Sequence, residues 1–332
     1  MRKTKGFLLI VALLNFWPEI SFADETKISE PATSVSAKQD ITPEVKPVVK
    51  KSKAKMAIDN SGAYLSDFST AELIDMFHYL EYDEYIKVPG NVYPRIFVKN
   101  MPYDFAAFEN QTERNRLFVQ ILMPLVLKVN NEILEERAYL DAVAYSFEQN
   151  HDFGEAETYY LELLAEKYDV TTPFKDTRRH MKLLKELTRR VDIVPPSILI
   201  AAAAVYTNWG TSRIAVQGNN LYKARDWYTD EGLKPIGEDD DSYRYHIYPS
   251  MEDSIRAYIL RINSHIKYQQ FWNSRKESRR RGSVVYGKRM DWTFVLDNNL
   301  QNYAGLLDYT LTYYKFFYLD EATLEEEYEF ES

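Results

Sequence analysis

Residues 190–222 read RVDIVPPSILIAAAAVYTNWGTSRIAVQGNNLY. The two prolines predict the start of a helix, and the run of isoleucine, leucine and alanine after them is apolar on every side. Such a helix belongs in the middle of a domain. Its last turn leads to Trp209-Gly210 and then to Asn219-Asn220. Polar and aromatic residues at the end of a buried helix are typical of a binding cleft. Equally, Trp209 can be a core residue and the two asparagines ordinary turn residues.

Helical patterns cover most of the rest of the chain and predict a mainly α-helical fold. Ser69-Thr70-Ala71-Glu72 is a capping-box start for a short helix, and Pro124 should kink or split the longest one. The run at 93–98 predicts a strand, and a period-two pattern at 243–248 predicts a short hairpin strand. The longer expected helices cover residues 112–149, 155–168, 178–191, 253–268 and 300–318.

Composition excludes several classes of protein. The chain has 332 residues, with 41 Lys and Arg against 50 Asp and Glu, so its net charge of −9 disfavours nucleic-acid binding. It has no cysteine, which removes disulfide scaffolds, thiol catalysis and Cys-ligated metal sites. The aromatic content is high, with 26 Tyr, 17 Phe and 5 Trp. Aromatic rings stack on sugar faces as well as filling cores, so this excess is compatible with a carbohydrate ligand.

The N-terminus predicts export. A basic start, an apolar run at 7–16 and Ser21-Phe22-Ala23 form a signal-peptide pattern for residues 1–23, and the apolar run is too short to span a bilayer. Residues 24–61 are poor in large apolar side chains and predict a disordered linker. We therefore expect a periplasmic or secreted protein with no stable membrane span after cleavage. Residues 321–332 form an acidic tail that is expected to fray.

Three patterns suggest chemistry that the rest of the sequence does not support. GSVVYGKR at 282–289 has phosphate-loop spacing but carries Arg289 where the magnesium-binding Ser or Thr belongs. The five histidines show no metal-ligand spacing, so we expect no metal and no cofactor. RKESRRR at 275–281 is interpreted as a solvated helix end, although peptidoglycan carries carboxylates that could meet it.

The stretch at 190–222 closely resembles the signature of the Bax-type glucosaminidases, relatives of the FlgJ-like domain of glycoside hydrolase family 73. The family pattern is R-V-D-x-V-P-x-S-L-x-L-A-Q-A-A-x-E-S-x-W-G-T-S-R-x-A-x-x-G-N-N-L-F-G. The resemblance continues through MPYDFAAF, FVQILMPLVLKVNNEILEER, YPSMEDSIRAYILRINSH and YAGLLDY, and so covers roughly residues 92–318. It implies a lysozyme-like glucosaminidase domain at 171–320 with a small β-hairpin. A helical N-terminal region at 62–170 would precede it.

The chain departs from this family at the positions that matter most. The resemblance places the catalytic Glu three residues before the Trp-Gly pair, where this chain has Tyr206, and a second acid at the position of Arg244. Thr207, Ala202 and Lys223 also replace the Ser, Gln and Gly of the pattern. Glycoside hydrolysis needs an acid that protonates the leaving oxygen. A tyrosine phenol, with a pKa of about 10 against about 6 for a tuned carboxylic acid, is weaker as a donor by about 5.5 kcal/mol.

Two hypotheses follow for function. In the first, a degenerate glucosaminidase-like domain binds peptidoglycan glycan strands without cutting them, or docks on another cell-wall enzyme. In the second, the protein is an active endo-β-N-acetylglucosaminidase with a relocated acid, for which Asp226, Asp230 and Glu231 are candidates. Whether it is an enzyme stays open at this point. The candidate glycan-binding residues are Tyr206, Trp209, Asn219, Asn220, Tyr222, Trp227 and Tyr303.

Overall fold

The structure is a computed structural model that describes residues 53–82, 90–173, 177–236, 242–290, 293 and 301–327. The chain divides into two units. The large one comprises residues 47–223 and 247–332, and the small one residues 1–46 and 224–246. The expected signal peptide (1–23), the linker up to residue 52 and the end of the tail (328–332) lie outside the described residues.

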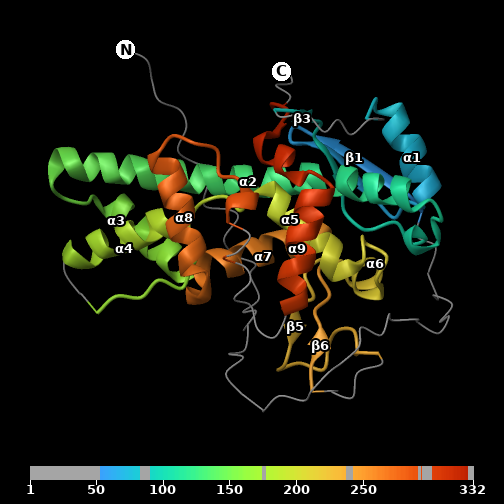
Figure 1. Ribbon diagram of the computed structural model, residues 1–332. Helices are drawn as coiled ribbons and strands as arrows, with labels where there is room; N and C mark the ends of the chain where they lie inside the picture. The colour runs from blue at the N-terminus through green and yellow to red at the C-terminus, as the bar shows by residue number, and fades with distance from the viewer. Residues whose placement is uncertain are drawn as a thin grey trace. The chain divides into compact units, whose positions relative to one another are not determined.

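The large unit is mainly α-helical, as predicted (Figure 1). The capping box at Ser69 is present, because the Ser69 side chain accepts from the Glu72 amide and the Glu72 carboxylate accepts from the Ser69 amide. The α-helices are α1 (Thr70–Tyr79), α2 (Gln111–Asn150), α3 (Glu155–Lys167), α4 (Thr177–Arg190), α5 (Pro196–Thr207), α6 (Arg213–Gly218), α7 (Met251–Ser264), α8 (Gln269–Arg280) and α9 (Gln301–Tyr313). The first five lie close to the expected positions, α7 and α9 end before the expected residues 268 and 318, and α6 and α8 lie where no helix range was predicted. Short 3-10 turns join them at η2 (Phe105–Ala107), η3 (Ile266–Tyr268), η4 (Gly287–Arg289) and η6 (Phe316–Glu321).

Helix α5 is the centre of the large unit. Each residue from Pro196 to Ala204 is buried, as the all-round apolar pattern predicts. Helices α2 and α9 and the turns η4 and η6 pack around it, and the four consecutive alanines at 201–204 give these neighbours room to approach. Because α5 is packed between these elements, the position of its last turn is fixed relative to them.

Of the two outcomes expected at Pro124, a kink or a split, the split does not occur. A proline cannot donate to the carbonyl four residues earlier, which here is the carbonyl of Gln120. The Tyr82 hydroxyl donates to that buried carbonyl at 2.9 Å, and the Gln120 amide in turn donates to the Tyr82 carbonyl. Because the carbonyl released by proline has another donor, the helix runs unbroken from Gln111 to Asn150.

The N-terminal part of the large unit contains a three-stranded sheet. β1 (Lys55–Asp59) pairs antiparallel with β2 (Gly62–Ser66), which pairs parallel with β4 (Ile96–Val98). β1 lies within the segment that we expected to be disordered, so that expectation is wrong for residues 55–59. Its side chains are exposed, and backbone pairing with β2 gives it order where side-chain burial does not.

The acidic tail is not frayed where the structure describes it. β7 (Thr323–Leu324) pairs with β3 (Val92–Tyr93) in a parallel ladder. The buried side chain of Arg95 donates to the carbonyl of Glu325 at 3.1 Å and to the carboxylate of Glu327 at 2.7 Å. One hydrophobic core of the large unit includes residues on both sides of the predicted boundary at residue 170, from Leu65 to Leu319.

By length and composition, α2 could cross a membrane. However, 78% of its most apolar window is buried inside the protein. α2 packs on α4, α5, α7 and β4, which is how a core helix of a globular unit behaves.

The described part of the small unit is a hairpin. β5 (Arg225–Asp226) pairs antiparallel with β6 (Arg244–Tyr245), which confirms the period-two prediction at its centre. Gly232 packs against the Tyr245 backbone with φ +120°, and a Cβ there would lie 2.6 Å from the Tyr245 carbonyl oxygen. Glycine is therefore the residue that fits this position of the hairpin without strain.

Candidate functional site

The last turn of α5 and the turn after it form the first part of the candidate site. Tyr206 is half-buried and packs against the hydrophobic core. Asn208, Trp209 and Gly210 then follow in the left-handed conformation, with φ of 49°, 59° and 79°. The Thr207 hydroxyl supports this turn, because it accepts from the Gly210 amide at 2.8 Å. A Cβ on Gly210 would lie 2.9 Å from side-chain atoms of Met101 and Phe118, so the family's Trp-Gly pair has a steric reason here.

Trp209 is held by other aromatic residues. Its ring lies edge-on to three rings, with centroid distances of 5.8, 4.5 and 6.1 Å to Phe118, Tyr314 and Phe316. The Tyr314 hydroxyl accepts from the Asn115 amide at 3.1 Å, which fixes the ring nearest to the indole. Trp209 is half-buried, so it is partly structural and keeps some surface that a ligand could contact.

Asn219, Asn220 and Tyr222, which the sequence analysis assigned to glycan binding, are buried and packed against neighbouring residues. Asn219 ends α6 in the left-handed conformation, and its amide donates to the Tyr248 carbonyl at 3.0 Å. Asn220 is completely buried. Tyr222 stacks on Tyr258 at 3.9 Å inside the core, where burial raises its pKa far above the usual value. These side chains therefore present little surface to a ligand.

The other candidates are distributed over different parts of the chain. In the hairpin, Trp227 is half-buried with its ring 4.9 Å from that of Tyr243. Arg244 is buried there, donates to the Tyr243 carbonyl at 2.8 Å and lies 3.7 Å from the Asp230 carboxylate. Tyr303 belongs to the first turn of α9, whose side chains lie outside the described residues.

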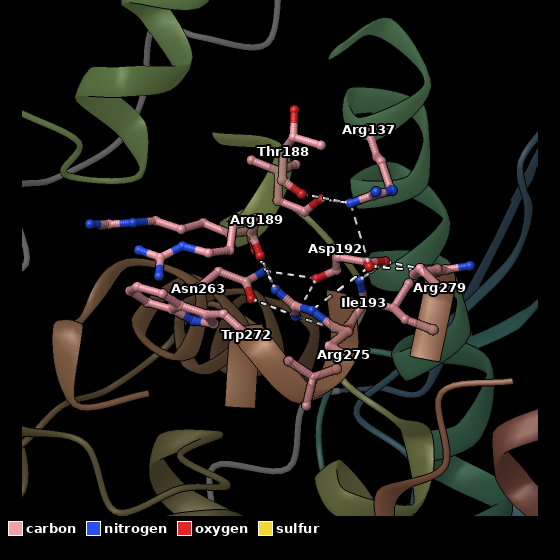
Figure 2. A network of polar contacts seen from close by, with 12 residues as sticks. Arg137, Thr188, Arg189, Asp192, Ile193, Asn263, Trp272, Arg275 and Arg279 are labelled. Atoms are coloured by element: carbon pink, nitrogen blue, oxygen red, sulfur yellow. Dashed lines mark hydrogen bonds and ion pairs between the residues drawn. The ribbon is translucent and has the colours of Figure 1, made fainter. Parts of the chain in front are cut away.

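The segment just before α5 contains a polar network that the sequence analysis missed. Figure 2 shows the guanidinium of Arg275 inside this network, where it donates to the carbonyl oxygens of Asp192 (3.0 Å) and Ile193 (2.8 Å). It also donates to the carbonyl oxygen of Arg190 at 2.6 Å. Burial lowers the pKa of Arg275 to about 10, so it stays charged at neutral pH. The interpretation of 275–281 as a solvated helix end is therefore wrong for Arg275, because carbonyl groups replace its water.

Asp192 provides the negative charge of the same network. Its carboxylate forms an ion pair with the Arg279 guanidinium at 2.7 Å. The guanidinium groups of Arg137 and Arg275 lie 3.5 and 3.8 Å from the same carboxylate (Figure 2). Burial acts to raise its pKa, but the charges of Arg275, Arg279 and Arg137 outweigh burial and hold the pKa below the usual range. The Arg-Val-Asp motif of residues 190–192 therefore joins α2, α4 and α8 at the entry to α5.

The N-terminal end of α5 is held by a buried carboxyl group. Asp320 accepts from the Ser197 amide (2.9 Å), the Ser197 hydroxyl (2.8 Å) and the Gly287 amide (2.8 Å). Burial raises the pKa of Asp320 to about 7 against the lowering effect of these donors. Gly287, from the stretch with phosphate-loop spacing, lies against α5, where a Cβ would come 2.2 Å from the Ser197 hydroxyl oxygen. That stretch thus has a packing role.

The sequence that forms α5 and the turn after it contains no carboxyl groups. No Asp or Glu occurs in the sequence between Asp192 and Asp226. Asp320 binds Ser197 at the opposite end of α5. Ser197 lies nine residues before Tyr206, which is about 14 Å along the helix axis. In the hairpin, Asp230 and Glu231 are exposed, and Asp226 accepts from the Tyr228 amide at 2.9 Å. Within the described ranges, no group of three or more metal-ligating side chains is placed to hold a metal ion.

Comparison with known proteins defines the class. Residues 181–322 match the Glucosaminidase family, described as mannosyl-glycoprotein endo-beta-N-acetylglucosaminidase. The chain is also 29% identical over 192 residues to Protein bax of Escherichia coli (strain K12), which is 56% of this chain. The match spans 64% of that relative, less than two thirds of its length. No solved structure gives a significant match.

Residues 181–322 are therefore similar to a glucosaminidase domain, and the similarity to Protein bax agrees with the resemblance seen in the sequence. The family match includes α5, the Trp-Gly turn and the residues that fix both ends of α5.

Proposed function

We propose that the protein is exported and binds peptidoglycan glycan strands through its glucosaminidase-like domain without hydrolysing them. The observation that carries this proposal is Tyr206 in the last turn of α5, at the position where the family resemblance expects the catalytic Glu. The scaffold of that position is retained, since Thr207, Gly210 and Trp209 form an ordered turn. A retained scaffold without its acid favours binding over cleavage.

Tyr206 and the half-buried edge of Trp209 are the residues of the large unit that we assign to glycan contact, because both keep exposed surface. Trp227 is the corresponding candidate of the hairpin unit. Aromatic rings that stack on sugars and amide or hydroxyl groups that bond to them remain useful after the loss of an acid. A cell-wall enzyme remains a second possible partner of the same protein.

The alternative is a hydrolase with a relocated acid. A glycosidase acid is normally kept protonated by an apolar surrounding, as a carboxyl group in a hydrophobic pocket is. Asp230 and Glu231 are exposed, and Asp320 lies at the other end of α5. Asp226 is half-buried and is the candidate that this alternative would use.

Sedimentation with purified sacculi, run beside an assay for released muropeptides, tests the proposal. We expect the wild type to sediment with sacculi and to release no muropeptides. Tyr206→Ala should weaken sedimentation, whereas Tyr79→Ala, a change at an exposed tyrosine of α1, should not. Release of muropeptides that is lost in Asp226→Asn would support the hydrolase instead.

A further inference from the structure

Although the chain is acidic overall, positive charge is concentrated on two helices that pack together. Helix α4 has the sequence TRRHMKLLKELTRR, with six Arg and Lys and one Glu, and α8 ends in RKESRR. α4 packs against α8 (Figure 1). The inward side of α8 is used by the buried Trp272 and Arg275 and by Arg279, which binds Asp192, whereas Lys276 and Arg280 are exposed.

The cations of α4 form one stripe. Arg178, Lys182, Lys185 and Arg189 are spaced by four, three and four residues, which is the repeat of a single helical face. Leu183 and Leu187, which are fully buried, occupy the opposite face. The stripe therefore faces away from Leu183 and Leu187 over a length of about 16 Å, and at its C-terminal end Arg189 packs over the Trp272 ring with 16% of its side chain exposed.

The stripe continues onto α8. The Arg189 guanidinium donates to the Asn273 amide oxygen at 3.5 Å, and Lys276 and Arg280 follow Asn273 at the spacing of one helical face. Lys276 is exposed, and the Arg280 side chain is 70% exposed. We call the six cations the basic face: Arg178, Lys182, Lys185, Arg189, Lys276 and Arg280.

Internal ion pairs leave this face positive. Glu186 is shared by Lys182 and Arg189, and Glu277 is shared by Arg280 and Arg281. Each carboxylate thus balances at most one of its two cations, and the basic face with these two carboxylates keeps a net charge of +4. Met181 lies beside the stripe with 48% of its surface exposed.

We propose that the basic face docks on a membrane surface through the phosphates of anionic lipid headgroups. Charge complementarity selects the orientation, because a chain of net charge −9 is repelled by an anionic surface everywhere except where cations are concentrated. The apolar tip of Met181 among the cations favours a lipid interface over a fully hydrated polymer. This inference is independent of the proposed glycan binding, since none of its residues belongs to the last turn of α5.

Sedimentation of the full chain with vesicles of phosphatidylglycerol and phosphatidylcholine tests the proposal, beside vesicles of phosphatidylcholine alone. We expect binding to the anionic vesicles only, and release at high salt. The triple variant Lys185→Glu, Lys276→Glu, Arg280→Glu should bind at least about tenfold more weakly. A matched control, Lys99→Glu, Arg116→Glu, Lys234→Glu, has the same total charge and should bind as the wild type.

Both variants carry the same N-terminal lysines, so their difference reports the basic face alone. Inorganic polyphosphate at constant ionic strength is the competitor that distinguishes lipid headgroups from phosphate in solution, and it should displace the protein only partly. Equal binding of the triple variant and the wild type would contradict the proposal. So would binding, through this face, to sacculi or polyphosphate but not to vesicles, which would make a polymer the partner. Unchanged sacculus binding by the triple variant would leave the glycan proposal intact.

Discussion

At the scale of single residues, Tyr206 and Arg244 are the positions that set this chain apart from its family pattern. Each stands where the resemblance expects an acid. A phenol and a guanidinium are both poor proton donors at neutral pH. The remaining features of the α5 turn have visible structural roles: Thr207 supports the turn, and Gly210 fits where a Cβ would clash.

Restoring both acids should therefore restore a trace of activity. Tyr206→Glu combined with Arg244→Glu is expected to release muropeptides from sacculi above the wild-type background, and Tyr206→Glu alone less, because it restores one position of two. High-performance chromatography of the released fragments measures both. Strong release by the wild type that persists in Tyr206→Phe would contradict the loss of the acid.

Gly287 provides a second test at this scale. A Cβ there would lie 2.2 Å from the Ser197 hydroxyl oxygen and 2.8 Å from a side-chain carbon of Ile198. Gly287→Ala should lower the free energy of unfolding by about 1–3 kcal/mol, the usual range for overpacking. Urea unfolding measures this change. Gly305→Ala, at an exposed position of α9 with open space, is the control and should be neutral or stabilising. Equal effects of the two changes would exclude tight packing at Gly287.

At the scale of elements, periodicity in the sequence predicts the helices well, because apolar spacing directly reflects which face is buried. The exceptions arise from partners far away in the chain. Pro124 is tolerated in α2 because Tyr82 donates to the carbonyl that proline leaves without a donor. Arg275 is buried because carbonyl groups of residues 189–193 surround it, and no local pattern announces such an environment.

The candidate site was predicted less completely than the fold. The sequence indicates the α5 turn. However, the same asparagine pattern in a loop occurs in sugar-binding sites and in ordinary turns, so the sequence does not distinguish the two roles. Burial separates the two roles: Asn220 has no exposed surface, and the Asn219 amide is used by Tyr248. The Asp320 carboxyl that fixes the start of α5 comes from the far end of the chain, with no motif to mark it.

The network around Asp192 predicts a dependence of stability on pH. The pKa of Asp192 is lowered in the folded protein, so in acid the unfolded chain takes up the proton first and the stability due to the carboxylate is lost as the pH falls below about 4. Asp192→Asn should cost about 3–5 kcal/mol at neutral pH and flatten this acid dependence. Urea unfolding at several pH values measures it, with Asp75→Asn, an exposed change in α1, as the control. Parallel pH profiles for wild type and Asp192→Asn would contradict the role of the carboxylate.

At the scale of the whole molecule, the C-terminal segment fastens the N-terminal part of the large unit. β7 pairs with β3, and Arg95 binds Glu325 and Glu327. Deletion of residues 322–332 should lower the free energy of unfolding by about 2–4 kcal/mol, because these hydrogen bonds are lost and the buried Arg95 loses partners. Thermal unfolding measures the effect. Deletion of 328–332 alone keeps all of these contacts and should change the free energy of unfolding little. Equal losses of stability in both deletions would contradict the role of β7 and Arg95 in fastening the N-terminal part.

The same scale brings together the two proposed surfaces, the last turn of α5 for glycan and the basic face for lipid. A protein that contacts both would hold glycan strands close to a membrane. The two activities should be separable, because the tests change different residues: Tyr206→Ala should spare vesicle binding and the triple variant should spare sacculus binding.

The central claim is that the glucosaminidase-like domain retains its scaffold for glycan and has lost the chemistry. The most direct measurement is a paired assay of the wild-type protein on purified sacculi between about pH 4 and pH 8, the range in which a tyrosine phenol stays neutral. Sedimentation records binding and chromatography records released fragments from the same samples. We expect binding throughout and no release at any pH. Catalytic release of glycan fragments by the wild type, at any pH in that range, would contradict the account.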